Sequence, residues 1–205
     1  MFLGNDIVDL SFISEKFKEN KQRYHNFSLS FTEKERFGKL LENDSFFWLI
    51  WSMKESLYKS WVKAGYRKRF NPKQIELGNI VPETGVTYLT RNTDFNNNIY
   101  VVNSYMDQNV IHSISRLKNH NDRIKYGLKK ITSTEYSEQT LEVRKLLFEL
   151  IPSEISKTAK VVKDRFYIPT LLPNNGPIRY DISLSHEGNY VASVCQADFN
   201  YLITD

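Results

Sequence analysis

A carboxylate and a lysine stand one helical turn apart in the most hydrophobic part of this 205-residue chain. Glu55 and Lys59 belong to the segment 46–63, FFWLIWSMKESLYKSWVK, and their i, i+4 spacing puts them on one face of a helix. They could form an ordinary ion pair at the edge of the core. Alternatively, Glu55 binds a metal ion and Lys59 receives an anionic substrate. The second reading requires another acid and an anion-binding element elsewhere in the chain.

Candidates for both lie near the two ends of the sequence. Asp6, in the strand-like segment 1–10, shares an apolar face with Val8, which is unusual for an acid. A structural alternative is that Asp6 or Asp9 caps the following turn. Ser185 and His186 stand at a turn between two apolar segments, where the histidine could donate a hydrogen bond to a phosphate or simply be satisfied within the turn.

The segment 46–63 must position the first pair, and its pattern predicts a buried helix. It contains no glycine or proline, and Asp44 or Ser45 could cap its N-terminus. Its apolar residues recur at the spacing of one buried helix face: Phe46, Ile50, Met53, Leu57 and Trp61.

The remaining pattern predicts an α+β fold. Ser30 and Glu33 have the spacing of a capping box for a short helix to Leu41. A second amphipathic helix covers 138–150, and a faint repeat relates the segments 101–114 and 182–194. We expect two similar halves, residues 1–118 and 119–205, each with an antiparallel sheet packed on a long helix. Strands are expected at 74–80, 86–90, 99–103, 110–115, 166–172, 180–184 and 190–197.

Composition narrows the function classes. The 28 Lys and Arg residues nearly balance the 24 Asp and Glu residues, so net charge says little about partners. No apolar run approaches the roughly 20 residues of a membrane span, and acids near Met1 argue against a signal peptide. The single cysteine, Cys195, excludes an internal disulfide and a thiolate cluster. We therefore expect a cytoplasmic protein with no membrane partner.

Three segments resemble the 4′-phosphopantetheinyl transferases. Gly4-Asn-Asp6-Ile resembles the family's first motif, and Trp51-Ser-Met-Lys-Glu55-Ser-Leu-Tyr-Lys59 matches its second. Ser183-Leu-Ser185-His186 matches its third. Each motif alone is weak, but the three together are specific, although they cover directly only about a tenth of the chain.

The resemblance implies a transferase that moves the phosphopantetheine group of coenzyme A onto a serine of an apo acyl or peptidyl carrier protein, with Mg²⁺ required and 3′,5′-ADP released. Asp6 and Glu55 would hold the metal, which suits the preference of Mg²⁺ for hard oxygen ligands. Lys59 would contact a phosphate. Ser185 and His186 would bind coenzyme A, and a looser alignment adds Lys163 and Arg165 near its nucleotide. The carrier would serve fatty-acid, polyketide or peptide assembly.

The sequence departs from the family pattern in two ways. Longer members carry a second acid two positions after the first, whereas here that position is Val8, as in the short trimeric acyl-carrier-protein synthases. The motif order also matches the short group, yet the chain is far longer. We therefore expect a circularly permuted pseudodimer that works as a monomer, with one composite site between its halves.

Two rival readings remain. Arg67, Lys68 and Arg69, together with 12 Tyr and 13 Phe residues, could form an RNA or single-strand binding surface without catalysis. That reading does not explain Asp6, Glu55 or His186, so we expect no nucleic-acid partner. A structural or regulatory protein with a decayed site would bind coenzyme A but transfer nothing.

Overall fold

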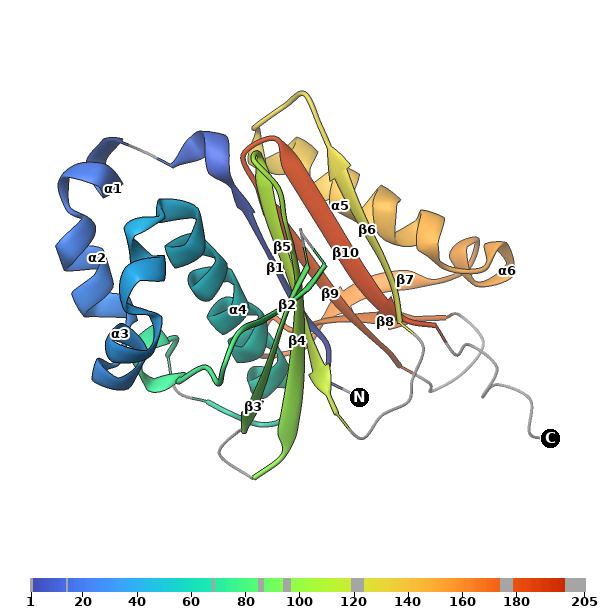
Figure 1. The fold of residues 1–205 in the computed structure, drawn as a ribbon. Helices are drawn as coiled ribbons and strands as arrows, with labels where there is room; N and C mark the ends of the chain where they lie inside the picture. Colours follow the sequence, from blue (N-terminus) through green and yellow to red (C-terminus); the bar gives the residue numbers. More distant parts are fainter. Residues whose placement is uncertain are drawn as a thin grey trace.

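Two antiparallel five-stranded sheets pack face to face, and a long helix covers the outer face of each (Figure 1). The computed structural model describes residues 2–13, 15–67, 69–84, 87–93, 97–118, 124–173 and 179–197. The α+β class predicted from the sequence is confirmed. The predicted boundary between residues 118 and 119 adjoins residues 119–123, which lie outside the described residues.

The first sheet has the strand order β1-β5-β4-β3-β2. Its strands are β1 (Gly4–Asp9), β2 (Val81–Thr84), β3 (Thr87–Thr93), β4 (Ile99–Met106) and β5 (Val110–Leu117). Helices fill the chain between β1 and β2: η1 (Leu10–Phe12), α1 (Glu15–Glu19), α2 (Lys21–Ser28), α3 (Phe31–Phe37), η2 (Gly38–Glu42), α4 (Asp44–Lys63) and η3 (Pro72–Gln74).

The second sheet has the corresponding order β6-β10-β9-β8-β7. Its strands are β6 (Ile124–Lys130), β7 (Lys160–Lys163), β8 (Pro169–Leu172), β9 (Tyr180–Glu187) and β10 (Tyr190–Gln196), with α5 (Tyr136–Leu150) and α6 (Ser153–Ser156) between β6 and β7. In both sheets the first strand is followed by the long helix and then by four strands. The predicted strand 166–172 begins only at Pro169, and the basic segment before it forms β7.

Helix α4 packs against the first sheet through the predicted face. Phe46, Ile50, Met53, Leu57 and Trp61 are all buried and belong to one core cluster. The predicted cap was wrong by one residue, because the side chain of Asn43 accepts the hydrogen bond from the backbone of Ser45. The capping box of Ser30 and Glu33 is present, and α3 continues into η2 after Phe37.

The two sheets share an apolar interface of their own. Leu3, directly before β1, packs with Ile114 and Val194, while Ile7 of β1 packs with Tyr190 and Ala192. Alternate residues of β1 therefore face the second sheet, and the intervening residues face α4. This alternation brings Asp6 toward the helix that carries Glu55.

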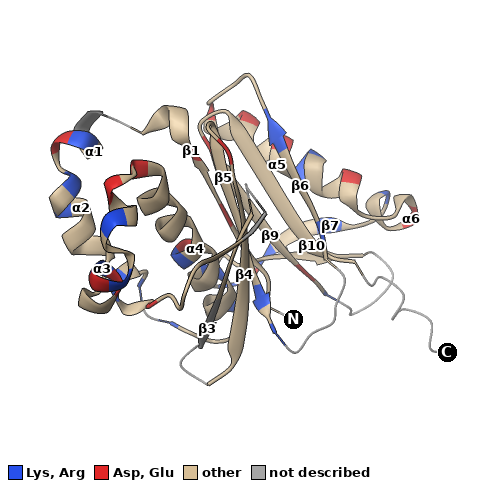
Figure 2. Cartoon of the chain, viewed as in Figure 1, with Lys and Arg blue, Asp and Glu red and all other residues tan. Residues whose placement is uncertain are grey.

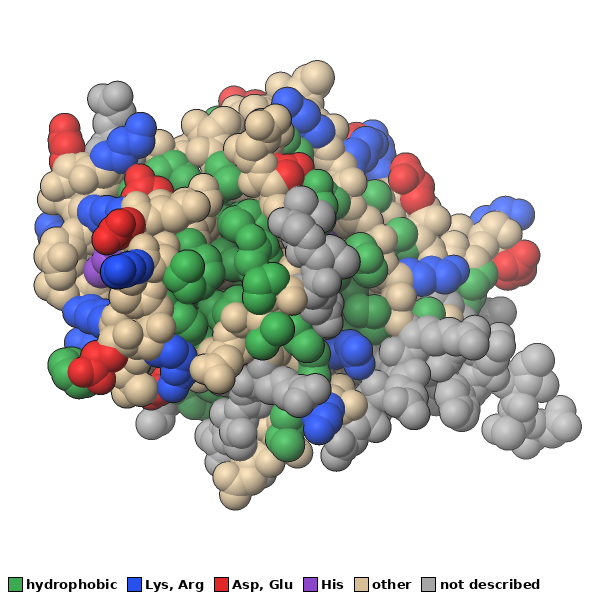
Figure 3. Space-filling model, viewed as in Figure 1, with side chains coloured by type: hydrophobic (Ala, Val, Ile, Leu, Met, Phe, Trp, Pro, Cys, Tyr) green, Lys and Arg blue, Asp and Glu red, His purple; other side chains and the backbone are tan. Residues whose placement is uncertain are grey.

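Charge is distributed around these layers. Lys, Arg, Asp and Glu crowd onto the outer helices, whereas β4 and β10 carry none (Figure 2). Hydrophobic side chains also reach the surface between the helices at the left and the strands at the centre (Figure 3). Polar residues therefore do not completely cover the hydrophobic core between α4 and the first sheet. Within the described ranges, no helix combines the length and hydropathy needed to cross a membrane.

Candidate active site

A glycine allows α4 to lie directly on β1. A Cβ atom at Gly4 would stand 2.0 Å from the carbonyl oxygen of Ser56, a distance that no real side chain tolerates. The hydroxyl of Ser115 on β5 donates to the same carbonyl oxygen at 2.7 Å. Helix and strand are therefore held at a fixed, short separation one residue from Glu55 and two residues from Asp6.

At this contact, one ammonium group meets two carboxylates. Lys59 Nζ lies 2.8 Å from Asp6 Oδ1 and 3.4 Å from Glu55 Oε1. Asp6 is buried, whereas the side chains of Glu55 and Lys59 remain about one-third exposed, at 31% and 28%. The i, i+4 ion pair considered from the sequence is present, and the second acid contacts the same lysine.

Burial and crowding change the acidity of these groups. Burial raises the pKa of Asp6 from 3.8 to about 7; Lys59 opposes the rise, and the carboxylates of Glu55 and Glu187 add to it. Burial alone would lower the pKa of Lys59, but Asp6 and Glu55 outweigh it and raise that pKa. With three carboxylates and one lysine, this part of the cavity has a surplus of negative charge.

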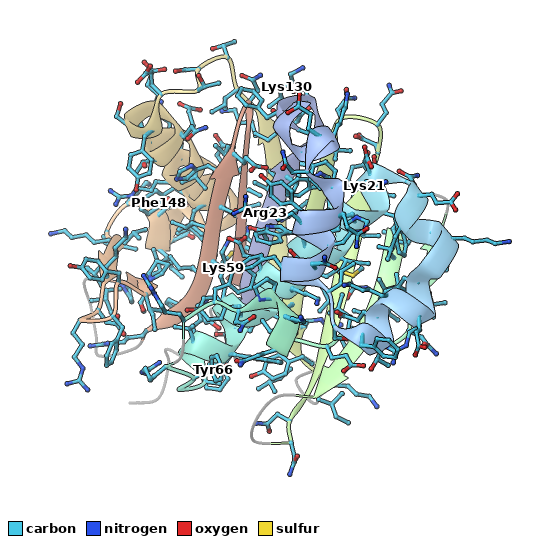
Figure 4. The ribbon with its side chains drawn as sticks, turned by 90° about the vertical axis from the view of Figure 1, so that its left-hand side faces the viewer. Lys21, Arg23, Lys59, Tyr66, Lys130 and Phe148 are labelled. Atoms are coloured by element: carbon cyan, nitrogen blue, oxygen red, sulfur yellow. The ribbon has the colours of Figure 1, made fainter. Side chains whose placement is uncertain are left out.

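Strand β9 reaches the same place from the second sheet and runs parallel to β1. The backbone N–H groups of Leu3 and Asn5 donate to the side chains of Asp181 and Ser183, at 2.6 and 3.0 Å. Ser183 therefore joins the two sheets, whereas the hydroxyl of Ser185 lies 3.5 Å from Lys59 Nζ. In Figure 4, Lys59 lies where α4 meets the strands of the second sheet.

His186 lies between this site and α5. Its ring packs edge-on against Tyr136, with centroids 5.2 Å apart. Burial lowers the pKa of His186, and the ammonium groups of Lys59 and Lys163 lower it further. The imidazole is therefore neutral at pH 7 and can donate one hydrogen bond.

A cavity of about 230 Å³ joins these groups. The structure brings five of the predicted site residues into its lining: Asp6, Glu55, Lys59, Ser185 and His186. Ile7, Trp51 and Glu187 are also exposed to it. Segments from both ends of the chain therefore meet around one polar space.

The other two predicted site residues are not in this lining. Lys163 ends β7 and acts on His186 only through its charge. The guanidinium of Arg165 lies 4.8 Å from the ring centroid of Phe166, and Arg67 lies 4.2 Å from the same centroid. Arg165 is thus engaged with an aromatic ring outside the cavity.

Sequence reasoning missed Glu187. Its Oε2 accepts a hydrogen bond from the backbone N–H of Asp9 at 2.9 Å, and burial raises its pKa. Its position directly after Ser185-His186 was the available signal. Asp9 fills the capping role considered for it, because its side chain accepts from the N–H and the hydroxyl of Ser11 and from the N–H of Asn189.

Lys54 has a structural partner that the sequence did not reveal. Its buried ammonium group lies 2.5 Å from Glu33 Oε2 and donates to the carbonyl oxygens of Ser28 and Pro72. It therefore ties α4 to the elements on either side of it. Removal of one partner from such a buried pair leaves an uncompensated charge.

The acids offer oxygen ligands suited to Mg²⁺. The described residues contain no cluster of three or more His, Cys, Asp or Glu side chains with metal-binding geometry. Asp6 and Glu55 nevertheless converge on one cation, the ammonium of Lys59, and the surplus negative charge favours a further one. Mg²⁺ commonly uses one or two protein carboxylates and completes its shell with waters and phosphates.

In a comparison with known proteins, one family model matches the chain. Residues 2–114, more than half of the chain, match the family described as ACPS, 4′-phosphopantetheinyl transferase superfamily. The matched segment includes Asp6, Glu55 and Lys59, whereas Ser185 and His186 lie beyond it. No curated protein and no solved structure matches the chain.

Proposed function

Because the chain belongs to the 4′-phosphopantetheinyl transferase superfamily, we propose that it transfers the 4′-phosphopantetheine group of coenzyme A to a serine of an apo acyl or peptidyl carrier protein. The observation that carries this proposal is the contact of Asp6 and Glu55 with one ammonium group, beside Ser185 and His186 in a single cavity. Both substrates would meet in this cavity.

Asp6 and Glu55 are the proposed ligands of Mg²⁺. The donor set fits, because both groups are carboxylates and their mutual repulsion is relieved by a cation. When bound, the ion would neutralise charge on the pyrophosphate of coenzyme A. Lys59, now bound to Asp6, would be free to contact a phosphate once the ion had taken over the carboxylates.

The proposed reaction is a phosphoryl transfer. The serine oxygen of the carrier forms a bond to the phosphorus that bears pantetheine, and the bond from that phosphorus to the bridging oxygen breaks. The electron pair leaves with 3′,5′-ADP, while Glu55 or a water molecule accepts the serine proton. Catalysis of this kind depends mainly on positioning and charge stabilisation, which His186, Ser185 and Lys59 would supply.

The nucleotide end of coenzyme A would extend beyond the cavity. Lys163 is the better placed of the two predicted cations, because its charge acts on His186. Arg165 would have to leave Phe166 to reach a phosphate. We retain both residues as proposed contacts to the 3′-phosphate and adenine.

We also propose that the chain is a permuted pseudodimer, with halves 1–118 and 119–205, that works as a monomer in the cytoplasm. The recurrence of strand order and helix position in the two sheets supports this. Chromatography with light scattering should give the mass of one chain, whereas an obligate trimer would contradict one complete site per chain.

One assay tests the function. The chain is mixed with an apo carrier protein, coenzyme A and Mg²⁺, and the carrier is weighed by mass spectrometry. We expect the carrier to gain one phosphopantetheine group. Coenzyme A binding without any gain would instead favour the decayed-site reading. Arg67 gives the nucleic-acid reading no support, because its guanidinium donates to the carbonyl oxygens of Val62 and Tyr66. Lys68 lies outside the described residues.

A further inference from the structure

The outer edge of β1 is closed by side chains of β9. The backbone N–H groups of Leu3, Asn5 and Asp9 donate to side chains located 178 residues later, at 2.6, 3.0 and 2.9 Å. The donors are alternate residues because successive N–H groups of a strand point in opposite directions. Each of these three donors is therefore satisfied without a neighbouring strand.

One donor in this series has no side-chain acceptor on β9. Ile7 has the same alternation as Asn5 and Asp9, so its N–H also points toward β9 and away from β5. At the same spacing its partner would be Ser185, but that hydroxyl lies near Lys59 instead. Among the described residues, no side chain accepts a hydrogen bond from the N–H of Ile7, unlike those of Asn5 and Asp9.

The N–H of Ile7 faces the candidate active site. Ile7 is 3% exposed, and it lines the cavity with Lys59 and Ser185. A buried N–H group without an acceptor destabilises a fold, so such groups are rare unless a ligand or water supplies one. The polar cavity is where that acceptor can enter.

We propose that the backbone N–H of Ile7, together with Ser185 Oγ and Lys59 Nζ, receives a nonbridging phosphate oxygen of the substrate's pyrophosphate. This inference rests on the proposed function and adds a positioning group to it. The strand fixes the direction of the N–H before the substrate arrives, so little reorganisation is needed when charge develops on the phosphate.

The proposal also separates the two serines of the Ser183-Leu-Ser185 segment. Ser183 accepts the N–H of Asn5 and closes the edge, whereas Ser185 leaves the N–H of Ile7 open. Two identical residue types on the same face of β9 therefore have different roles. The first holds the sheets together, and the second keeps a donor available for the substrate.

Amide NMR of the ¹⁵N-labelled chain tests the proposal directly. The probes are inorganic pyrophosphate and coenzyme A, each with Mg²⁺. We expect the Ile7 amide proton to move downfield on binding, and its exchange with solvent to slow by about tenfold or more. Asn5 and Asp9 are internal controls, since their N–H groups already have acceptors. An Ile7 amide that stays unchanged while either probe binds would overturn the proposal.

A backbone ester gives a second test. Replacement of Ile7 by its α-hydroxy acid keeps the side chain and removes only the N–H. We expect the affinity for pyrophosphate to fall by roughly 10- to 100-fold, the range for a hydrogen bond to a charged group. The same replacement at Asn5 should lower stability and leave affinity unchanged. Equal affinity of the Ile7 ester and the wild-type chain would refute the role.

The outcomes also separate this inference from the proposed function. If the Ile7 amide responds but the carrier gains no mass, the phosphate receptor stands and the transfer proposal fails. If the carrier gains mass while the Ile7 amide does not respond, transfer stands and the receptor fails. If neither probe binds, both fail.

Discussion

The two long helices meet their sheets through the same contact. On α4, the carbonyl oxygen of Ser56 accepts from the hydroxyl of Ser115 at 2.7 Å, and on α5 the carbonyl oxygen of Val143 accepts from the hydroxyl of Ser193 at 2.8 Å. We call the junction of β1 with α4 the first corner and the junction of β6 with α5 the second corner.

A glycine also marks each corner. Gly4 on β1 and Gly127 on β6 both lie under the helix, where a Cβ would meet Ser56 or Leu146. The positions of the serine bond and the glycine together align the two corners residue by residue.

Counted from these landmarks, the corners differ at the positions that matter for chemistry. Glu55 and Glu142 both precede the bonded carbonyl by one residue. Two residues after the glycine, however, the first corner has Asp6 and the second has Lys129. Lys129 Nζ lies 2.9 Å from Glu142 Oε2, so the second corner carries its own cation.

The pKa values of the carboxyl groups in the two corners differ because Lys129 occupies the position that Asp6 has in the first corner. The ammonium groups of Lys145 and Lys129 lower the pKa of Glu142 to about 2, whereas burial and neighbouring carboxylates raise the pKa of Asp6 to about 7. In the second corner, Lys129 and Lys145 neutralise the charge of Glu142. The first corner keeps an excess of carboxylates over lysines. We infer that a metal ion would therefore bind at the first corner and not at the second.

The largest effect should come from the acids of the first corner. Asp6→Asn and Glu55→Gln should each reduce phosphopantetheine transfer by about 10³-fold or more, because each removes a charge that would hold the metal. Mass spectrometry of the carrier measures this. Glu142→Gln is the matched control in the second corner and should leave transfer intact. Activity retained in both first-corner variants would mean that the metal is misassigned.

The glycines offer a comparison of packing. Gly4→Ala should lower the free energy of unfolding by about 3 kcal/mol or more, because the clash is with backbone. Gly127→Ala should cost about 1 kcal/mol, since its Cβ meets the movable end of Leu146 at 2.9 Å. Urea denaturation gives both values. Equal costs would show that α4 is as free to shift as the Leu146 side chain.

The contributions of Asp6 and Glu142 to the free energy of unfolding should change in opposite directions as pH rises. Folding raises the pKa of Asp6 from 3.8 to about 7, so its contribution to stability is present below the lower value and lost as pH rises through the higher. Asp6→Asn should therefore be more stable than wild type at pH 8 and nearly equal to it below pH 4.

Glu142 shows the opposite case. Its pKa falls from 4.5 to about 2 on folding, so its contribution is present above the higher value and lost as pH falls through the lower. Glu142→Gln should accordingly lose stability relative to wild type only toward neutral pH. Denaturation curves of both variants between pH 3 and pH 8, recorded without divalent ions, test the contrast. If the stabilities of the two variants changed with pH in the same direction, the contrast between the corners would be wrong.

The smallest effect is expected from an acid placed in the second corner. Lys129→Asp should change the free energy of unfolding only slightly, since Lys129 is well exposed. It also puts a carboxylate beside Glu142. Mn²⁺ should then raise the Tm of the variant by a few degrees more than it raises the Tm of wild type, in which only the first corner offers two acids. A variant that does not respond to Mn²⁺ would show that two acids alone do not make this junction a metal site.

Local patterns made the fold class and α4 predictable from sequence. The apolar repeat from Phe46 to Trp61 marked the buried face, and Ser30 with Glu33 marked a helix start. The three motifs pointed to residues that the structure brings into one cavity, although their roles remain proposals. The ion pair of Lys54 with Glu33 was not predictable, because its 21-residue separation has no helical or strand period.

The same limit applies to β9. Ser183 and Ser185 look alike in sequence, and only the alignment of β9 beside β1 shows which one closes an N–H. The contact of Arg67 with the ring of Phe166 was hidden for a similar reason, because it joins the segment after α4 to the turn after β7. Contacts between segments far apart in the sequence decide these cases.

The closure of β1 by β9 has a consequence for biosynthesis. A ribosome makes β1 before β9, and the side chains that cap the edge of β1 follow it by 178 residues. While those residues are being made, a nascent chain carries open N–H groups beside an apolar strand face, the kind of edge that chaperones shield from aggregation. The proposed transfer would therefore require that β9 has been made and has reached β1.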